Sequence, residues 1–206
     1  MTTLQALAAF LVAAGLLTIT PGLDTAMILR TAAVEGPRRA AMAALGICAG
    51  CLVWGLAVAL GLGLLLTAST TAYTVLKWAG AAYLVWMGLG LILRPRSRFE
   101  LEAPATRRGS NWFLRGLMTN LLNPKVGVFY VSFLPQFVPA GVAAGPFIVL
   151  LTAIHVTLGL IWSAGLIGAT APLKTWLSRG AVVRWLDRVT GGVFLAFGLK
   201  LALERR

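Results

Sequence analysis

The chain has 206 residues, of which 59% are hydrophobic and only 12% are charged, and its mean hydropathy is +0.87. A soluble domain carries about 25% charged residues, so this composition excludes an ordinary water-soluble fold and predicts an integral membrane protein. The net charge is +12, but the basic residues lie in short segments between apolar stretches. That placement suits anionic membrane lipids and argues against nucleic acid as a partner.

Six apolar segments are candidates for membrane-spanning helices, each of which needs about 20 residues. Long apolar runs must be helical in lipid, because a helix pairs its own backbone groups. We therefore predict an all-α, polytopic membrane protein with six transmembrane helices. The sixth segment is the weakest, and whether it fully spans stays open. In chain order the segments are about Leu4–Leu29, Ala40–Leu66, Tyr73–Leu93, Phe113–Leu134, Ala144–Ala171 and Val182–Leu203.

The loop charges predict the orientation of these spans. Loops one, three and five hold thirteen Lys and Arg residues, whereas the opposite side holds four. By the positive-inside rule the first group is cytoplasmic, so we expect a multi-pass protein of the cytoplasmic membrane with both termini outside. The chain is predicted to be a single transporter domain, with repeat 1 at about 1–93, a polar cytoplasmic linker at about 94–112 and repeat 2 at about 113–206.

The two halves resemble each other in sequence. Thr20 and Pro21 are echoed 103 residues later by Asn123 and Pro124. Because each half holds three predicted spans, an odd number, the two repeats must be inverted across the membrane. Inverted three-helix repeats are typical of secondary transporters.

Both of these prolines lie inside apolar segments and predict broken first and fourth helices. Thr or Asn at the N-cap with Pro at the next position is a helix-start pattern. A half-helix that starts within the membrane presents unpaired amides and a positive dipole end, which attract an anion. The alternative is a pair of packed proline kinks without a ligand. The predicted substrate-binding residues are Thr20, Pro21, Gly22, Asp24, Asn120, Asn123, Pro124 and Lys125.

Three of the ionisable residues within the predicted spans are candidates for cargo binding or proton coupling. A carboxylate in lipid costs about 2.5–3.5 kcal/mol, so Asp24 is predicted to bind a substrate ammonium or carry the coupling proton, or else to neutralise Lys125 or cap its half-helix. Lys125 is a candidate for the substrate carboxylate, or alternatively snorkels to the interface. His155 is a candidate proton relay, because imidazole titrates near neutral pH, although a packing role is the alternative.

Cys48 and Cys51 form a C-x-x-C pattern, which in a soluble protein indicates redox chemistry. Here it lies on a charge-free segment, which favours two small packing residues. A transmembrane thiol or electron carrier is kept as an alternative function, as is a membrane scaffold without transport. We find no metal-ligand cluster, phosphate loop or catalytic triad, so we expect no cofactor, no metal and no enzyme activity.

These residues resemble the lysine-exporter family with its homoserine/threonine-resistance branch (LysE/RhtB). The resemblance implies an exporter of amino acids in the cytoplasmic membrane that is driven by proton antiport and forms a homodimer. Small neutral cargo is favoured, because a cationic cargo would need more than one buried acid. The four motifs that carry the resemblance are Thr20–Gly22 with Asp24, residues 76–84 (LKWAGAAYL), Asn120 with Asn123–Lys125, and Phe133–Phe137.

Overall fold

The computed structural model describes residues 2–68, 70–95, 111–169, 175 and 179–203, and this part of the chain contains helices and no strand. The prediction of an all-α fold is therefore confirmed. Most of the predicted linker lies outside the described residues. The helices are α1 (Thr3–Ile19), α2 (Leu23–Glu35), α3 (Pro37–Ala68), α4 (Thr70–Leu93), α5 (Trp112–Leu121), α6 (Pro124–Val128), the π-helix η1 (Phe129–Phe133), the 3-10 helix η2 (Leu134–Phe137), α7 (Ala144–Gly168) and α9 (Gly180–Leu203).

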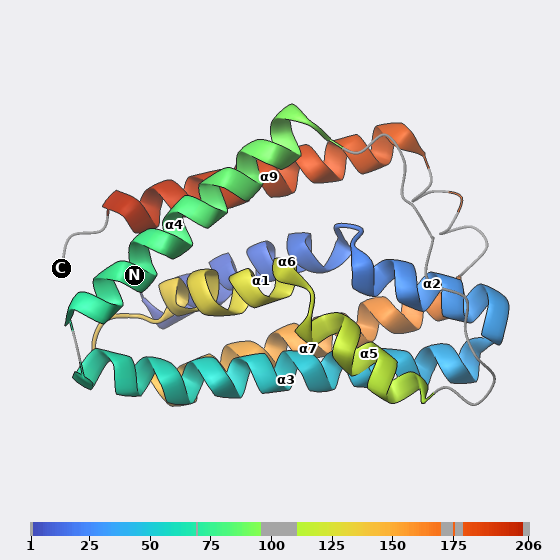
Figure 1. Cartoon of the computed structure of the whole chain (residues 1–206), viewed down its shortest axis with the longest axis horizontal. Helices are drawn as coiled ribbons and strands as arrows, with labels where there is room; N and C mark the ends of the chain where they lie inside the picture. The colour runs from blue at the N-terminus through green and yellow to red at the C-terminus, as the bar shows by residue number, and fades with distance from the viewer. Residues whose placement is uncertain (1, 69, 96–110, 170–174, 176–178, 204–206) are drawn as a thin grey trace.

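The helices form two outer groups, with α1 and α6 between them (Figure 1). The helices α4 and α9 pack along each other on one side, and α3 packs against α5 and α7 on the other. The helices α1 and α6 lie between these groups, where α1 contacts both α7 and α9. The two helix breaks, next to Pro21 and Pro124, therefore lie near the centre of the protein.

Two described helices are long and apolar enough to cross a membrane on their own, namely residues 37–61 of α3 and all of α7. The helices α1 and α2 meet the same test together, with a bend of 50° at their break, as either a broken span or a re-entrant loop. Many large apolar side chains of these helices, such as Leu60 and Ile161, are exposed at the surface of the chain. Such a surface suits contact with lipid rather than with water.

The first helix break confirms the prediction of a broken first helix, but its capping differs from the expected one. The helix α1 ends at Ile19 and α2 starts at Leu23, with Thr20 and Gly22 in extended conformations. Proline at position 21 disfavours a helical conformation for the residue before it. Thr20 therefore closes α1, with its hydroxyl donating to the carbonyl of Leu16 at 2.6 Å. The expected N-cap role of Thr20 is wrong, because the helix restarts two residues later with Gly22 at the N-cap.

The second helix break follows the predicted pattern. Asn123 is the N-cap of α6, its side-chain oxygen accepts from the Lys125 amide at 3.1 Å, and Pro124 occupies the first helical position. The chain then continues without leaving the helical path, as η1 and η2, to Phe137. The prediction of a broken fourth helix is therefore confirmed.

Close backbone contacts between α3 and α5 depend on glycine. A methyl group at Gly46 would collide with the carbonyl oxygen of Phe113, and one at Gly116 would collide with the carbonyl oxygen of Ala43. A methyl group at Gly50 would overlap the side chain of Asn120. These glycines let the two helices approach closely, as small residues do in membrane helix pairs, and they bring Asn120 into the protein interior.

Candidate functional site

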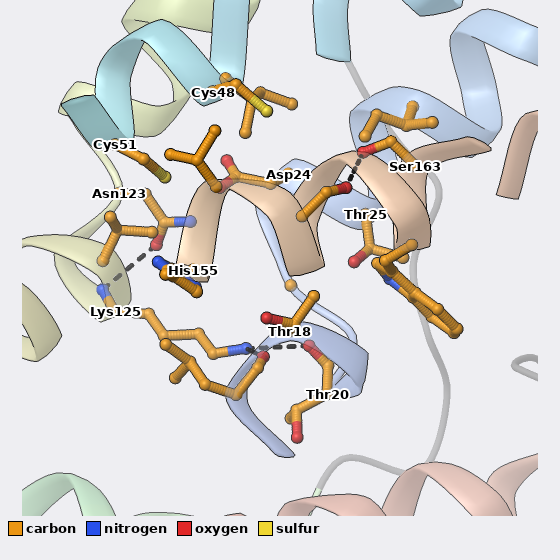
Figure 2. A pocket seen from close by; sticks show the side chains of 18 residues that line it. Thr18, Thr20, Asp24, Thr25, Cys48, Cys51, Asn123, Lys125, His155 and Ser163 are labelled. Atoms are coloured by element: carbon orange, nitrogen blue, oxygen red, sulfur yellow. Dashed lines mark hydrogen bonds between the residues drawn. The ribbon is translucent and has the colours of Figure 1, made fainter. Parts of the chain in front are cut away.

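A cavity of about 80 Å³ lies where the two helix breaks meet (Figure 2). Its walls come from the α1–α2 break, α3, the start of α6 and α7. Pro21, Pro124 and Asn120 do not line this cavity. The prolines shape the backbone beside it, and Asn120 donates a hydrogen bond to Asp24, which does line it. Six of the residues predicted from the sequence do line this cavity, namely Thr20, Gly22, Asp24, Asn123, Lys125 and His155.

Lys125 joins the two breaks. Its ammonium donates to the carbonyl oxygens of Leu17 at 2.9 Å and Thr20 at 2.8 Å (Figure 2). These carbonyls lie at the carboxyl end of α1, where carbonyl groups have no amide donors within the helix and the helix dipole is negative. The lysine therefore stabilises the interrupted end of α1 and places a positive charge at the cavity wall.

The amino end of α2 is the second positive feature of the cavity. Gly22 holds the N-cap position and provides no side-chain hydrogen bond to the first amides of the helix. A methyl group at Gly22 would lie 3.7 Å from the Lys125 ammonium nitrogen, so this helix end and the lysine are neighbours. Helix amino ends and ammonium groups both attract carboxylates.

Asp24 and Asn120 form the acceptor side of the site. The Asn120 amide donates to Oδ2 of Asp24 at 2.8 Å. Oδ1 of Asp24 and Oδ1 of Asn120 are both buried and have no hydrogen-bond partner among the described residues. A buried acceptor without a donor costs about 1–3 kcal/mol, and more if it is charged. A ligand ammonium would supply the missing donors.

His155 lines the cavity from α7 and is held by an aromatic partner that the sequence did not indicate. Its Nδ1 lies 2.9 Å from the hydroxyl of Tyr130, which is fully buried in η1. The ring of Phe129 lies 5.0 Å from the imidazole, centroid to centroid. No sequence signal distinguished Tyr130 from a packing residue, because its position depends on the π-helix.

Cys48 and Cys51 on α3 are buried, free thiols, and both line the same cavity. The Asn120 amide lies 3.5 Å from the Cys51 sulfur. The C-x-x-C pattern thus belongs to the wall of the cavity, beside Asp24 and Asn120.

Sequence reasoning did not single out Val156, Gly159 and Ser163 of the α7 wall or two residues of α9. Ser163 lines the cavity eight residues after His155, so the helical spacing along α7 could have indicated it. On α9, Thr190 contacts the Thr20 hydroxyl, and Asp187 has no exposed surface. Among the described acids, Asp24 lines the cavity, whereas the buried Asp187 does not.

A family model for the LysE type translocator matches residues 15–205. The chain belongs to the LysE type translocator family. The resemblance predicted from the four motifs is confirmed. The expectation of a membrane transporter agrees with this family.

The translocator is also similar to curated bacterial proteins over nearly its whole length. It is 26% identical to the "uncharacterized membrane protein YrhP" of Bacillus subtilis, over 98% of the chain and 100% of that protein. It is 29% identical to the homoserine/homoserine lactone efflux protein of Salmonella typhi, over 96% of each. It is 28% identical to the threonine efflux protein of Escherichia coli K12, over 91% of the chain and 92% of that protein. No solved structure matches the translocator.

Proposed function

We propose that this translocator exports small neutral amino acids across the cytoplasmic membrane in exchange for protons. The observation that carries the proposal is the pairing of opposite charges at one cavity. Lys125 and the amino end of α2 would bind the cargo carboxylate, and Asp24 with Asn120 would bind its ammonium. Relatives named for the efflux of threonine and of homoserine support a cargo of this class.

The binding site would work by alternating access. Each half of the chain has the same order of elements, a broken helix followed by two further helices, which supports two inverted repeats of three spans each. In this proposal the six spans place both termini outside, anionic lipids contact the cytoplasmic arginines, and two copies form a homodimer. The two repeats would rock around the cavity and open it to one side at a time.

Proton coupling would use the ionisable residues of the cavity. Asp24 and His155 both line it, so water within the cavity could carry a proton to either. The cargo ammonium and a proton would compete for Asp24. This competition is the simplest way to couple cargo export to proton import. The protein would then release cargo outside when a proton takes its place.

Transport by reconstituted protein tests the proposal. Proteoliposomes loaded with labelled threonine or alanine and given an inward proton gradient should lose the label, and Asp24→Asn should abolish this loss while the variant still inserts. Labelled lysine should leave far more slowly. Efflux by Asp24→Asn at the unmutated rate would contradict the mechanism, and no efflux of any amino acid by the unmutated protein would contradict the function.

A further inference from the structure

The wall that α7 contributes to the cavity has a gap at its centre. Five residues of α7 line the cavity, namely His155, Val156, Gly159, Trp162 and Ser163. Their spacing places them on one face of the helix, and Gly159 is the middle member. At the centre of this face the helix therefore carries no side chain.

Helix packing does not require this glycine. A methyl group at Gly159 would meet no atom within 4 Å, whereas methyl groups at Gly46, Gly50 and Gly55 would collide with neighbouring helices. Glycine within a helix destabilises it by about 0.5–1 kcal/mol relative to alanine. The space above Gly159 is therefore an extension of the cavity, kept open by a residue that weakens its helix.

The charged groups of the site cannot distinguish one amino acid from another. Asp24 and Lys125 would meet the ammonium and carboxylate that all amino acids share, so discrimination must come from the walls that meet the cargo side chain. The bare position of the α7 wall is flanked by Val156 and Trp162, which are bulky.

We propose that Gly159 sets the size of the side chain that the cavity accepts. This inference rests on the proposed amino-acid transport and adds a specificity-determining residue to it. A larger residue at this position projects into the cavity without disturbing the neighbouring helices. It therefore excludes larger cargo and leaves the smallest cargo bound.

The test compares two cargoes in proteoliposomes that contain the full chain. Gly159→Val should lower the transport of threonine relative to alanine by about tenfold or more, because one excess methylene in a pocket is worth about 10- to 200-fold. Gly159→Ala should shift the same ratio in the same direction by a smaller factor. The Gly159→Ala variant tests the proposal if Gly159→Val does not insert into the membrane.

A matched control lies on the same helix. A methyl group at Gly165 also meets no atom within 4 Å, and Gly165 does not line the cavity. Gly165→Ala and Gly165→Val should leave the threonine-to-alanine ratio unchanged. An unchanged ratio in inserted Gly159 variants, or an equal loss of both cargoes, would overturn the assignment alone. An unmutated protein that moves neither cargo would overturn the proposed function and the assignment together.

Discussion

The side-chain amide of Asn120 donates a hydrogen bond to Oδ2 of Asp24 at 2.8 Å. These residues are separated by 96 positions and come from the two broken segments of the chain. The bond fixes the carboxylate at the start of α2 and leaves Oδ1 of Asp24 for a ligand. The cavity therefore depends on contact between the two halves of the chain.

Removing this donor should weaken transport. Asn120→Leu keeps the approximate size of the side chain but leaves Asp24 without its amide. A hydrogen bond to a charged group contributes about 1.5–3 kcal/mol, so we expect kcat/KM for threonine efflux to fall about 10- to 100-fold.

Asn111→Ala is the matched control, because Asn111 caps the exposed start of the same helix α5. Its loss should cost about 1 kcal/mol of stability and leave kcat/KM near the unmutated value. Equal kcat/KM for Asn120→Leu and the unmutated protein would show that the amide does not position Asp24.

Lys125→Met should affect both stability and cargo binding. The carbonyls of Leu17 and Thr20 lose the ammonium that donates to them, so the Tm in detergent should fall. The KM for threonine should rise, since the carboxylate loses a positive partner. Arg94→Met, at an exposed position at the end of α4, should change neither quantity. A lower Tm with an unchanged KM would restrict Lys125 to a structural role.

Glycine-to-alanine substitutions at two positions of α3 should change the stability of the protein in opposite directions. Gly46→Ala places a methyl group against the Phe113 carbonyl, and overpacking of this kind costs about 1–3 kcal/mol. Gly61→Ala meets no atom within 4 Å and should stabilise the helix by about 0.4–1 kcal/mol. Thermal denaturation of the two purified variants in detergent measures the difference. A Gly46→Ala variant as stable as Gly61→Ala would contradict the close packing of α3 and α5.

Thiol chemistry should not be needed for transport. Cys48→Ser with Cys51→Ser keeps a small polar group at both positions of the cavity wall, so we expect threonine efflux within about threefold of the unmutated rate, a change below 1 kcal/mol. Abolished efflux, together with thiols whose alkylation depends on redox state, would instead support a carrier of reducing equivalents.

Local sequence signals predicted the parts of the fold that depend on a few neighbouring residues. Long apolar runs predicted helices, and Pro21 and Pro124 predicted the breaks, because proline acts on the residues next to it. The capping of the second break also followed, from Asn123. The capping of the first break did not follow from the sequence, because Gly22 is extended and α2 therefore starts beyond Thr20.

The parts that depend on contacts between distant segments could not be predicted. The position of Asn120 beside Asp24 depends on Gly46 and Gly116, which bring α3 and α5 together. The pairing of Tyr130 with His155 depends on a π-helical turn, which has no clear sequence signal. Asp187 lies beside charged residues in the sequence, and its complete burial depends on how α9 packs in the fold.

The account depends on one cavity that binds both charged groups of a single cargo molecule. Competition in proteoliposomes tests this most directly, with threonine efflux measured in the presence of an excess of either of two analogues. One analogue is the hydroxy acid, which lacks the ammonium. The other is threonine amide, which lacks the carboxylate. We predict that unlabelled threonine competes and that both analogues compete at least about tenfold more weakly, because each loses a charged contact worth more than 1.4 kcal/mol. Competition by either analogue at the strength of threonine would contradict the two-charge site.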